Sequence, residues 1–181
     1  INTALKLFNS HSYNSIGVDR IISESNVAKM TFYKYFPSKE KLIEECLIQR
    51  NINLQTSLNA TLEQCDPTNY LEQIKAIFHW YTVWFESEDF NGCMFQKALI
   101  EVIKIYPSTL KPATEYKTWL TNLTQNLLRN MDIQNPNHLA NLIVSILDGM
   151  TIQAHINRHT VQLEEYWKRV EHLIQFEKSM A

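Results

Sequence analysis

The sequence predicts an all-α protein of about nine helices, in which a small N-terminal head precedes a larger helical body. Its 181 residues are enough to bury a sizeable core. Only three Gly and five Pro interrupt the chain while 45% of the residues are hydrophobic, which indicates long helices rather than a turn-rich β fold. Apolar residues also recur at the three- and four-residue spacing of helices.

The first helix is expected from the start of the chain to about Asn9, and two short helices follow before residue 37. Each of these two has one apolar face, marked at i, i+3 and i+4 by Val18, Ile21 and Ile22 and then by Phe32 and Phe36. Asn26 lies between them, and Asn readily adopts the left-handed conformation of a tight turn. The pattern predicts a helix-turn-helix.

The second helix of this pair carries donors and cations outside its apolar face, at Lys29, Met30, Thr31, Tyr33 and Lys34. Amines and hydroxyls on such a surface suit the phosphates and base edges of a major groove. Residues 1–41 hold six Lys/Arg against three Asp/Glu, net +3, whereas residues 42–181 hold eleven against sixteen, net −5. This asymmetry fits a nucleic-acid-binding head on an acidic body.

A family resemblance rests on Ala4, Leu7, Phe8, Val18, Ile21, Val27, Thr31, Phe32, Tyr33, Phe36, Lys39 and Leu42. In residue type and offset, this stretch resembles the DNA-binding domain of the TetR family of bacterial repressors. The resemblance implies a DNA-binding domain at 1–45, a helical ligand-binding and dimerisation domain at 46–181, and release of DNA when a small molecule binds.

The roles that the resemblance implies fall on matching positions. Lys29, Met30 and Thr31 stand where the family approaches base edges, and Tyr33 and Lys39 stand at common phosphate contacts. The sequence departs from the family at Gly17, which replaces a capping Ser or Thr, at Asn26, which replaces Gly, and at Tyr35, which replaces His. The predicted DNA-binding set is Gly17, Lys29, Met30, Thr31, Tyr33, Lys34, Tyr35 and Lys39.

The remaining helices are delimited by caps and prolines. Pro37 ends the third helix because its ring forbids continuation, and Ser38 caps the fourth, which extends to about Leu62. We expect the others at Asp66-Pro67 to Glu86, Cys93 to Ile105, Pro112 to Asn130, Asn135-Pro136 to Asn157, and Thr160 to Lys178.

The fifth helix has a wide aromatic face that could line a ligand pocket. The candidate pocket residues are Phe78, Tyr81, Trp84, Phe95, Trp119, Met150 and Gln153. The same pattern also fits a dry core, and the resemblance favours the cavity because family members keep one among the equivalent helices. The expected effector is a small apolar or amphipathic molecule.

The last two helices are expected to form a homodimer on a palindromic operator. Their apolar positions are Leu139, Ile143 and Ile146 on the eighth helix, and Leu163, Trp167, Val170 and Ile174 on the ninth. One helix layer at the chain end does not easily bury both faces in a monomer. Packing of these faces onto the rest of the body is the alternative.

No residues indicate catalysis, a cofactor or a metal site. His155 and His159 are one turn apart, but no Glu lies between them and a surface pair explains them better than a metal site does. The three cysteines form no CxxC, which favours a reducing cytoplasm, and the apolar run Ala76–Phe85 is too short to span a membrane.

The alternative function is a helical carrier or enzyme with no operator, which would not need the donors and cations of the head. The chain starts at Ile1, without a Met and inside the first helical pattern, so we expect further residues upstream.

Overall fold

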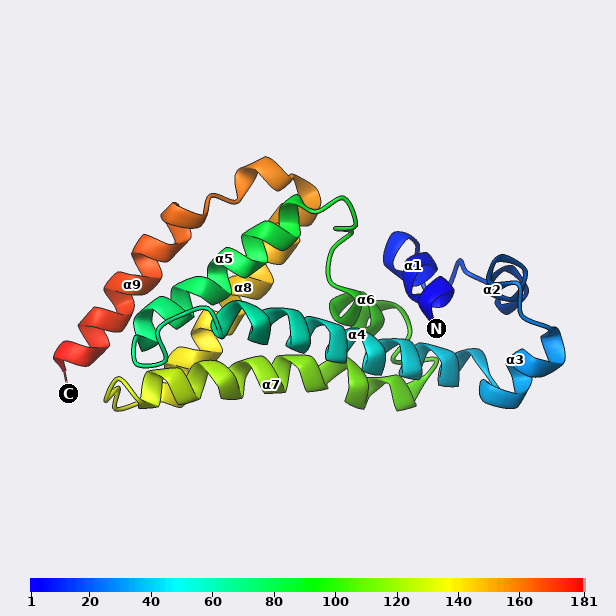
Figure 1. Cartoon of the computed structure of the whole chain (residues 1–181), viewed down its shortest axis with the longest axis horizontal. Helices are drawn as coiled ribbons and strands as arrows, with labels where there is room; N and C mark the ends of the chain where they lie inside the picture. Colours follow the sequence, from blue (N-terminus) through cyan, green and yellow to red (C-terminus); the bar gives the residue numbers. More distant parts are fainter. Residues whose placement is uncertain (181) are drawn as a thin grey trace. The chain divides into compact units, whose positions relative to one another are not determined.

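The computed structural model describes residues 1–180, and this part of the chain is all-α, as predicted (Figure 1). It contains nine α-helices and two short 3-10 turns, with no strand among the described residues. In chain order they are α1 (Asn2–Ser10), α2 (Val18–Ser25), α3 (Lys29–Tyr35), α4 (Lys39–Leu62), α5 (Tyr70–Glu86), α6 (Met94–Glu101), η1 (Pro107–Thr109), α7 (Leu110–Arg129), α8 (Pro136–Ile156), η2 (Arg158–Thr160) and α9 (Leu163–Ser179).

The helices form two compact units that are not contiguous in sequence. The first unit combines Ile1–Leu54 with Asn91–Tyr116, and the second combines Gln55–Phe90 with the chain from Lys117 onward. Helices α4 and α7 each contribute residues to both units. The domain boundary expected at residue 45 falls inside α4, and α6 belongs to the same unit as α1, α2 and α3.

The first unit begins with α1 packed against α2. The ring of Phe8 lies 4.9 Å from that of Tyr13, and both side chains are fully buried. Between α2 and α3, Asn26 adopts the left-handed conformation with φ 53° and ψ 30°, so the predicted tight turn is confirmed. At the start of α4, the Ser38 hydroxyl accepts a hydrogen bond from the Lys41 N–H at 3.1 Å, as expected of a cap.

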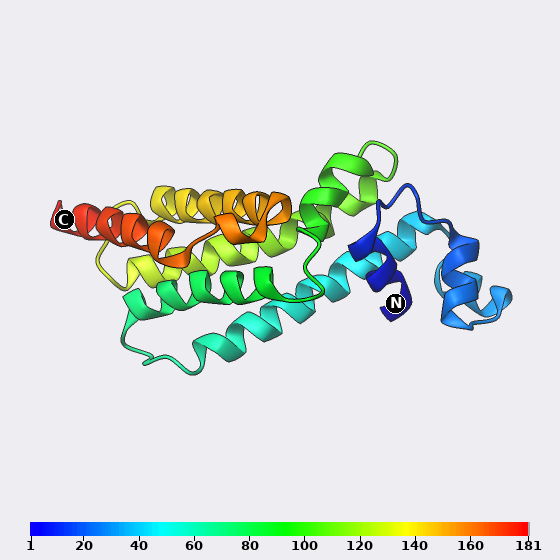
Figure 2. The same ribbon diagram turned by 90° about the horizontal axis from the view of Figure 1, so that it is seen from above.

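The second unit is built around α5, which packs against both α8 and α9 (Figure 2). The ring of Phe78 lies 5.8 Å from the Trp167 ring of α9. On another side of α5, the Trp80 indole N–H donates to the Ser57 hydroxyl at 3.0 Å. A helix with apolar contacts on several sides must be enclosed by others, as its wide apolar face predicted.

Three predicted helix boundaries are wrong. Asp66 does not cap α5: its carboxylate accepts bonds from the Thr68 N–H and hydroxyl, and this turn delays the helix to Tyr70. Asn69 is the cap instead, accepting from the Glu72 N–H at 3.1 Å. Helix α6 ends at Glu101 rather than Ile105, and α9 starts at Leu163 because η2 intervenes after Asn157. Local sequence offered several capping residues, and the structure uses Asn69 at the start of α5.

Helix α8 is long and apolar enough, by length and composition alone, to cross a bilayer. The core helix of a soluble protein meets the same test. Here Leu147, Met150 and Ala154 of α8 are fully buried within the second unit. The apolar character of α8 is therefore accounted for, on this face, by packing inside the protein.

Candidate nucleic-acid interface

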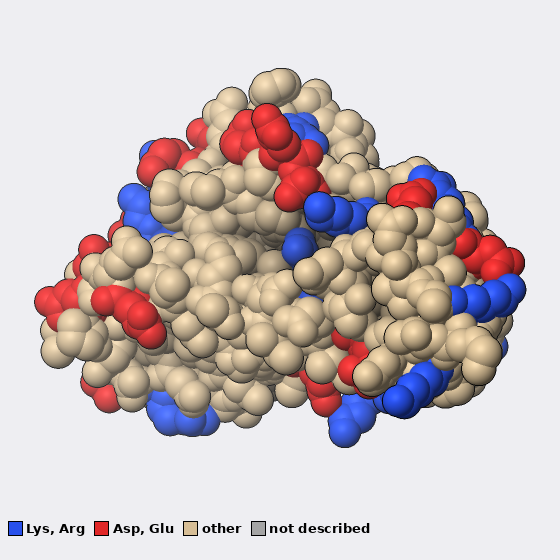
Figure 3. Space-filling model, turned by 45° about the vertical axis from the view of Figure 1, so that its right-hand side comes forward, with Lys and Arg blue, Asp and Glu red and all other residues tan. Residues whose placement is uncertain are grey.

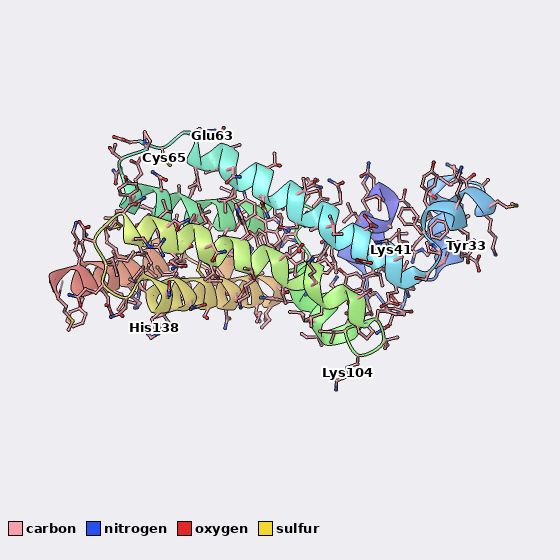
Figure 4. All side chains as sticks on the ribbon, turned by 90° about the horizontal axis from the view of Figure 1, so that it is seen from below. Tyr33, Lys41, Glu63, Cys65, Lys104 and His138 are labelled. Carbon is pink, nitrogen blue, oxygen red and sulfur yellow. The ribbon has the colours of Figure 1, made fainter. Side chains whose placement is uncertain are left out.

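Helix α3 is a seven-residue helix with one buried anchor and an otherwise open surface. Phe32 is buried, and its ring lies 5.5 Å from the Phe36 ring, so these two residues form the predicted apolar face. The side chains of Lys29, Met30, Thr31, Tyr33, Lys34 and Tyr35 are exposed. Met30 is 87% exposed, which is unusual for so apolar a side chain. Figure 4 labels Tyr33 on this helix.

The cations around α3 have local partners. Lys29 Nζ lies 3.0 Å from an Asp19 carboxylate oxygen, and this contact raises the pKa of Lys29. Arg20 pairs with Glu24 at 2.7 Å within α2. Lys34 Nζ lies 5.9 Å from the centroid of the Tyr35 ring. Acidic and basic side chains are correspondingly intermixed on the face shown in Figure 3.

Lys39 and the start of α4 complete the predicted DNA-binding set. Lys39 is half-buried, and desolvation lowers its pKa. It is the first residue of a 24-residue helix, where unpaired backbone N–H groups favour anions. The neighbouring Lys41, also labelled in Figure 4, pairs with Glu44 and Glu45. Lys39 and the helix end could therefore act on the same phosphate.

Gly17 is the exposed N-cap residue of α2 and has extended backbone geometry, with φ −82° and ψ 154°. It supplies no side-chain cap. A Cβ built on it meets nothing within 4 Å. The position therefore has room for the Ser or Thr that the resemblance leads one to expect there. Because Gly has no side chain to cap the helix, the backbone N–H groups at the start of α2 are left for another partner.

Helix α6 fastens the segment between α1 and α2, a feature the sequence analysis missed. Lys97 Nζ donates to the carbonyl oxygens of Phe8, Asn9 and His11 at 3.0, 2.9 and 3.2 Å, and burial lowers the pKa of Lys97. These carbonyls lie at the end of α1, which has no basic residue in its last turn. Lys97 thus acts as a C-cap supplied by another helix.

Glu101 of α6 holds the same segment by its acidic side chain. One carboxylate oxygen accepts from the Ser12 hydroxyl at 2.8 Å and from the Tyr13 N–H at 2.7 Å. The buried Tyr13 hydroxyl donates to the Met94 carbonyl at 3.1 Å. No local pattern signals these contacts, since the partners are more than 80 residues apart in the chain.

The family comparison agrees with this geometry. Residues 1–46 match the model of "Bacterial regulatory proteins, tetR family". The match to the tetR family thus covers the helix-turn-helix and the start of α4. The HTH-type transcriptional regulator YuxN of Bacillus subtilis is 54% identical over 43 residues, which cover 24% of this chain and 15% of YuxN. The HTH-type transcriptional repressor DhaR of a Mycobacterium species is 19% identical over 176 residues, 92% of this chain and 85% of DhaR.

Solved TetR-family structures share the fold over nearly the whole chain. SCO4454 from Streptomyces coelicolor has a TM-score of 0.86 at 22% identity, covering 98% of this chain and 93% of SCO4454. CifR, solved in complex with a 26-base-pair operator duplex, has a TM-score of 0.76 at 18% identity, covering 96% of this chain and 93% of CifR. The TetR-family fold thus extends beyond the matched head.

The predicted pocket residues of this protein do not share one environment. Phe78, Tyr81 and Met150 are buried in the second unit, whereas Gln153 is exposed on α8. The Phe78 ring contacts the Trp167 ring of α9. Phe95 belongs to the first unit, stacked on Tyr116 at 5.3 Å. Trp84 and Trp119 are half-buried.

An open groove lies instead between α5 and α9. Its volume is about 610 Å³, and its lining is largely charged: Asn69, Leu71, Glu72, Lys75, Glu164, Glu165, Trp167, Lys168 and Glu171. Lys75 Nζ lies 6.0 Å from the centroid of the Trp167 ring and 3.7 Å from Glu164. The groove contains none of the predicted pocket residues.

The predicted dimer residues lie mostly inside the second unit. Leu139 and Ile143 of α8 and Trp167, Val170 and Ile174 of α9 are buried within one chain, and Ile146 and Leu163 are half-buried. The dimer interface stays a prediction, and in the single chain these buried side chains are covered by residues of the same chain. Helical periodicity identified an apolar face, but it did not indicate that α5 of the same chain covers it.

Proposed function

We propose that this protein regulates transcription by binding operator DNA through α3 and the start of α4. The observation that carries the proposal is the exposed surface of Lys29, Met30, Thr31 and Tyr33 on a helix anchored by Phe32. A carrier or enzyme that does not bind DNA has no need to expose these side chains together. The match of residues 1–46 to the family supports the same role.

Different residues of this surface would have different tasks. Lys29 and Thr31 could donate to base edges, and the apolar Met30 could contact a thymine methyl group. Tyr33 and Lys39 would contact phosphates, which set position without reading sequence. The proposal assigns the chain no catalytic step, and it locates the protein with the DNA in the cytoplasm.

In the decisive experiment, the purified protein is mixed with duplexes of random sequence, and the DNA that it retains is sequenced. Mobility-shift assays then measure its affinity for the enriched sequences. An enriched palindrome bound with salt-dependent affinity is the expected result. Lys39→Ala should weaken binding to all sequences and reduce the salt slope by about one unit, whereas Lys29→Ala should change base preference by about 1–3 kcal/mol. Retention of no preferred sequence would reject operator binding.

We infer further that the protein acts as a homodimer through the exposed faces of α8 and α9. On α8, Leu142, Gly149, Ile152 and Ile156 follow helical spacing on the side away from the buried residues, and Ile156 is 76% exposed. On α9, Phe176 is 60% exposed and Met180 lies one turn further on. Apolar stripes on both helices support an isologous interface.

The dimer is tested by sedimentation of the wild type and of Ile152→Glu. The substitution places a charge on the exposed α8 stripe, so it should produce monomers that keep their helical content. A monomeric protein would occupy only one half-site and lose affinity for a palindrome whose half-sites are about 34 Å apart. A wild type that sediments as a monomer at micromolar concentration argues against the dimer.

We also infer that the protein is a repressor. A small apolar or amphipathic molecule would lower its affinity for the operator. The aromatic residues around Tyr81 and Trp84 of α5 support an apolar site. Helix α4 could carry its effect, because it contributes residues to both units. A coupling of about 1–3 kcal/mol would change operator affinity roughly 5–150-fold.

A thermal-shift screen of hydrophobic compounds would test this regulation. Compounds that raise the melting temperature, quench tryptophan fluorescence and release operator DNA are expected. Compounds that stabilise the protein without changing operator affinity would contradict the coupling while leaving a binding site in place. A ligand that tightens operator binding would contradict the release mechanism.

A further inference from the structure

The ion pair between Asp19 and Lys29 joins α2 and α3, the two helices of the helix-turn-helix, on the exposed surface of α3. Asp19 lies in the first turn of α2, and Lys29 is the first residue of α3. Their side chains are 84% and 64% exposed, and Nζ lies 3.0 Å from the carboxylate oxygen. The pair therefore lies where DNA would arrive, rather than inside a core.

The other charged groups of these two helices have partners of their own. Glu24 holds Arg20 within α2, and the Lys34 ammonium lies beside the Tyr35 ring. Asp19 is thus the carboxylate of α2 that contacts the first residue of α3. In the DNA-free protein, the ammonium group of Lys29 is directed toward α2.

We propose that Asp19 determines specificity by competing with DNA phosphates for the ammonium group of Lys29. The proposal rests on the proposed function, in which α3 meets DNA. An ammonium group has three donors, of which Asp19 uses one. A base edge is neutral, so Lys29 can donate to it while it keeps Asp19. A phosphate carries a full negative charge that repels the Asp19 carboxylate, so pairing of Lys29 with a phosphate opposes its pairing with Asp19.

Asp19 would therefore lower the affinity for non-specific DNA more than the affinity for the operator. Binding to unspecific DNA consists almost entirely of phosphate contacts, whereas specific binding adds base contacts. Breaking an exposed ion pair changes an equilibrium by at most about fivefold. Asp19 would lower affinity for unspecific DNA by a factor of that order and leave the operator complex nearly unaffected.

The test compares Asp19→Asn with Glu24→Gln, because both substitutions remove one negative charge from α2. Affinity is measured for a random-sequence duplex and for the selected operator across a salt series. Asp19→Asn should raise random-duplex affinity about three- to fivefold and steepen its salt slope by about one unit, with less than about a twofold change on the operator. Glu24→Gln should change either affinity less than about twofold.

Equal effects of the two variants, or an equal rise on both duplexes, would overturn the role of Asp19. The Lys29→Gln background separates competition from simple repulsion between Asp19 and DNA. In that background Asp19→Asn should add less than about twofold, and an undiminished effect would also overturn the proposal. Failure to select any operator would reject the proposed function instead, while the random-duplex comparison would still decide whether Asp19 competes for Lys29.

Discussion

Replacing Lys97 by Met should loosen the link between α6 and the end of α1. The ammonium group donates to three carbonyl oxygens from half-buried surroundings, whereas Met has a similar length and no donor. The carbonyls of Phe8 and Asn9 are partly buried and would lose a partner, while water can reach that of His11. The substitution therefore removes a cap and keeps most of the packing.

The expected cost follows from those two carbonyls. Leaving a buried acceptor unsatisfied costs about 1–3 kcal/mol, and we take the lower end for each because both are only partly buried. The loss is then about 2 kcal/mol, equivalent to a fall of roughly 4–8 °C in melting temperature for a chain of this size. Lys97→Arg keeps the charge and donors, so it should recover part of the loss.

Calorimetry and amide hydrogen exchange can measure both consequences. The matched control is Lys104→Met, because Lys104 follows α6 and projects outward in Figure 4; it should cost less than about 0.5 kcal/mol. Faster exchange in Lys97→Met should be concentrated in α1 and at the Tyr13 amide. A melting temperature equal to that of the Lys104 control, with unchanged exchange in α1, would refute the capping role.

Three further outcomes are expected. Gly17→Ser should stabilise the protein by a few tenths of a kcal/mol up to about 1 kcal/mol in urea unfolding, because it adds a cap to α2 where a Cβ meets nothing within 4 Å; a destabilised variant would contradict this. Trp167→Glu should unfold the second unit rather than yield folded monomers, since Trp167 is only 3% exposed, and circular dichroism would distinguish the two. Burial raises the pKa of Cys46 from 9.0 to about 12. The unfolded thiol therefore loses its proton first, so stability should fall above pH 9 by up to about 1.4 kcal/mol per pH unit, and Cys46→Ala should show a shallower fall.

Local sequence was sufficient for features that depend on neighbouring residues. Asn26 adopts the left-handed turn, Ser38 caps α4, and Phe32 lies on the buried side of α3, all as predicted. Each of these depends on residues within about one helical turn, and the chemistry of those residues is visible in the sequence. The Asp66 cap failed because Asp66 and Asn69, three positions apart, competed for the same role, and local chemistry alone did not rank them.

The sequence by itself therefore determined the all-α class, the helix-turn-helix and the side chains that α3 exposes. Only the tertiary structure decided which partner each surface meets. It covered Trp167 and Ile143 with the same chain, turned Phe78 toward α9, and joined Lys97 and Glu101 to the end of α1. The physical reason is that helical periodicity fixes which side of a helix is apolar, whereas the identity of the neighbour depends on contacts between residues far apart in the chain.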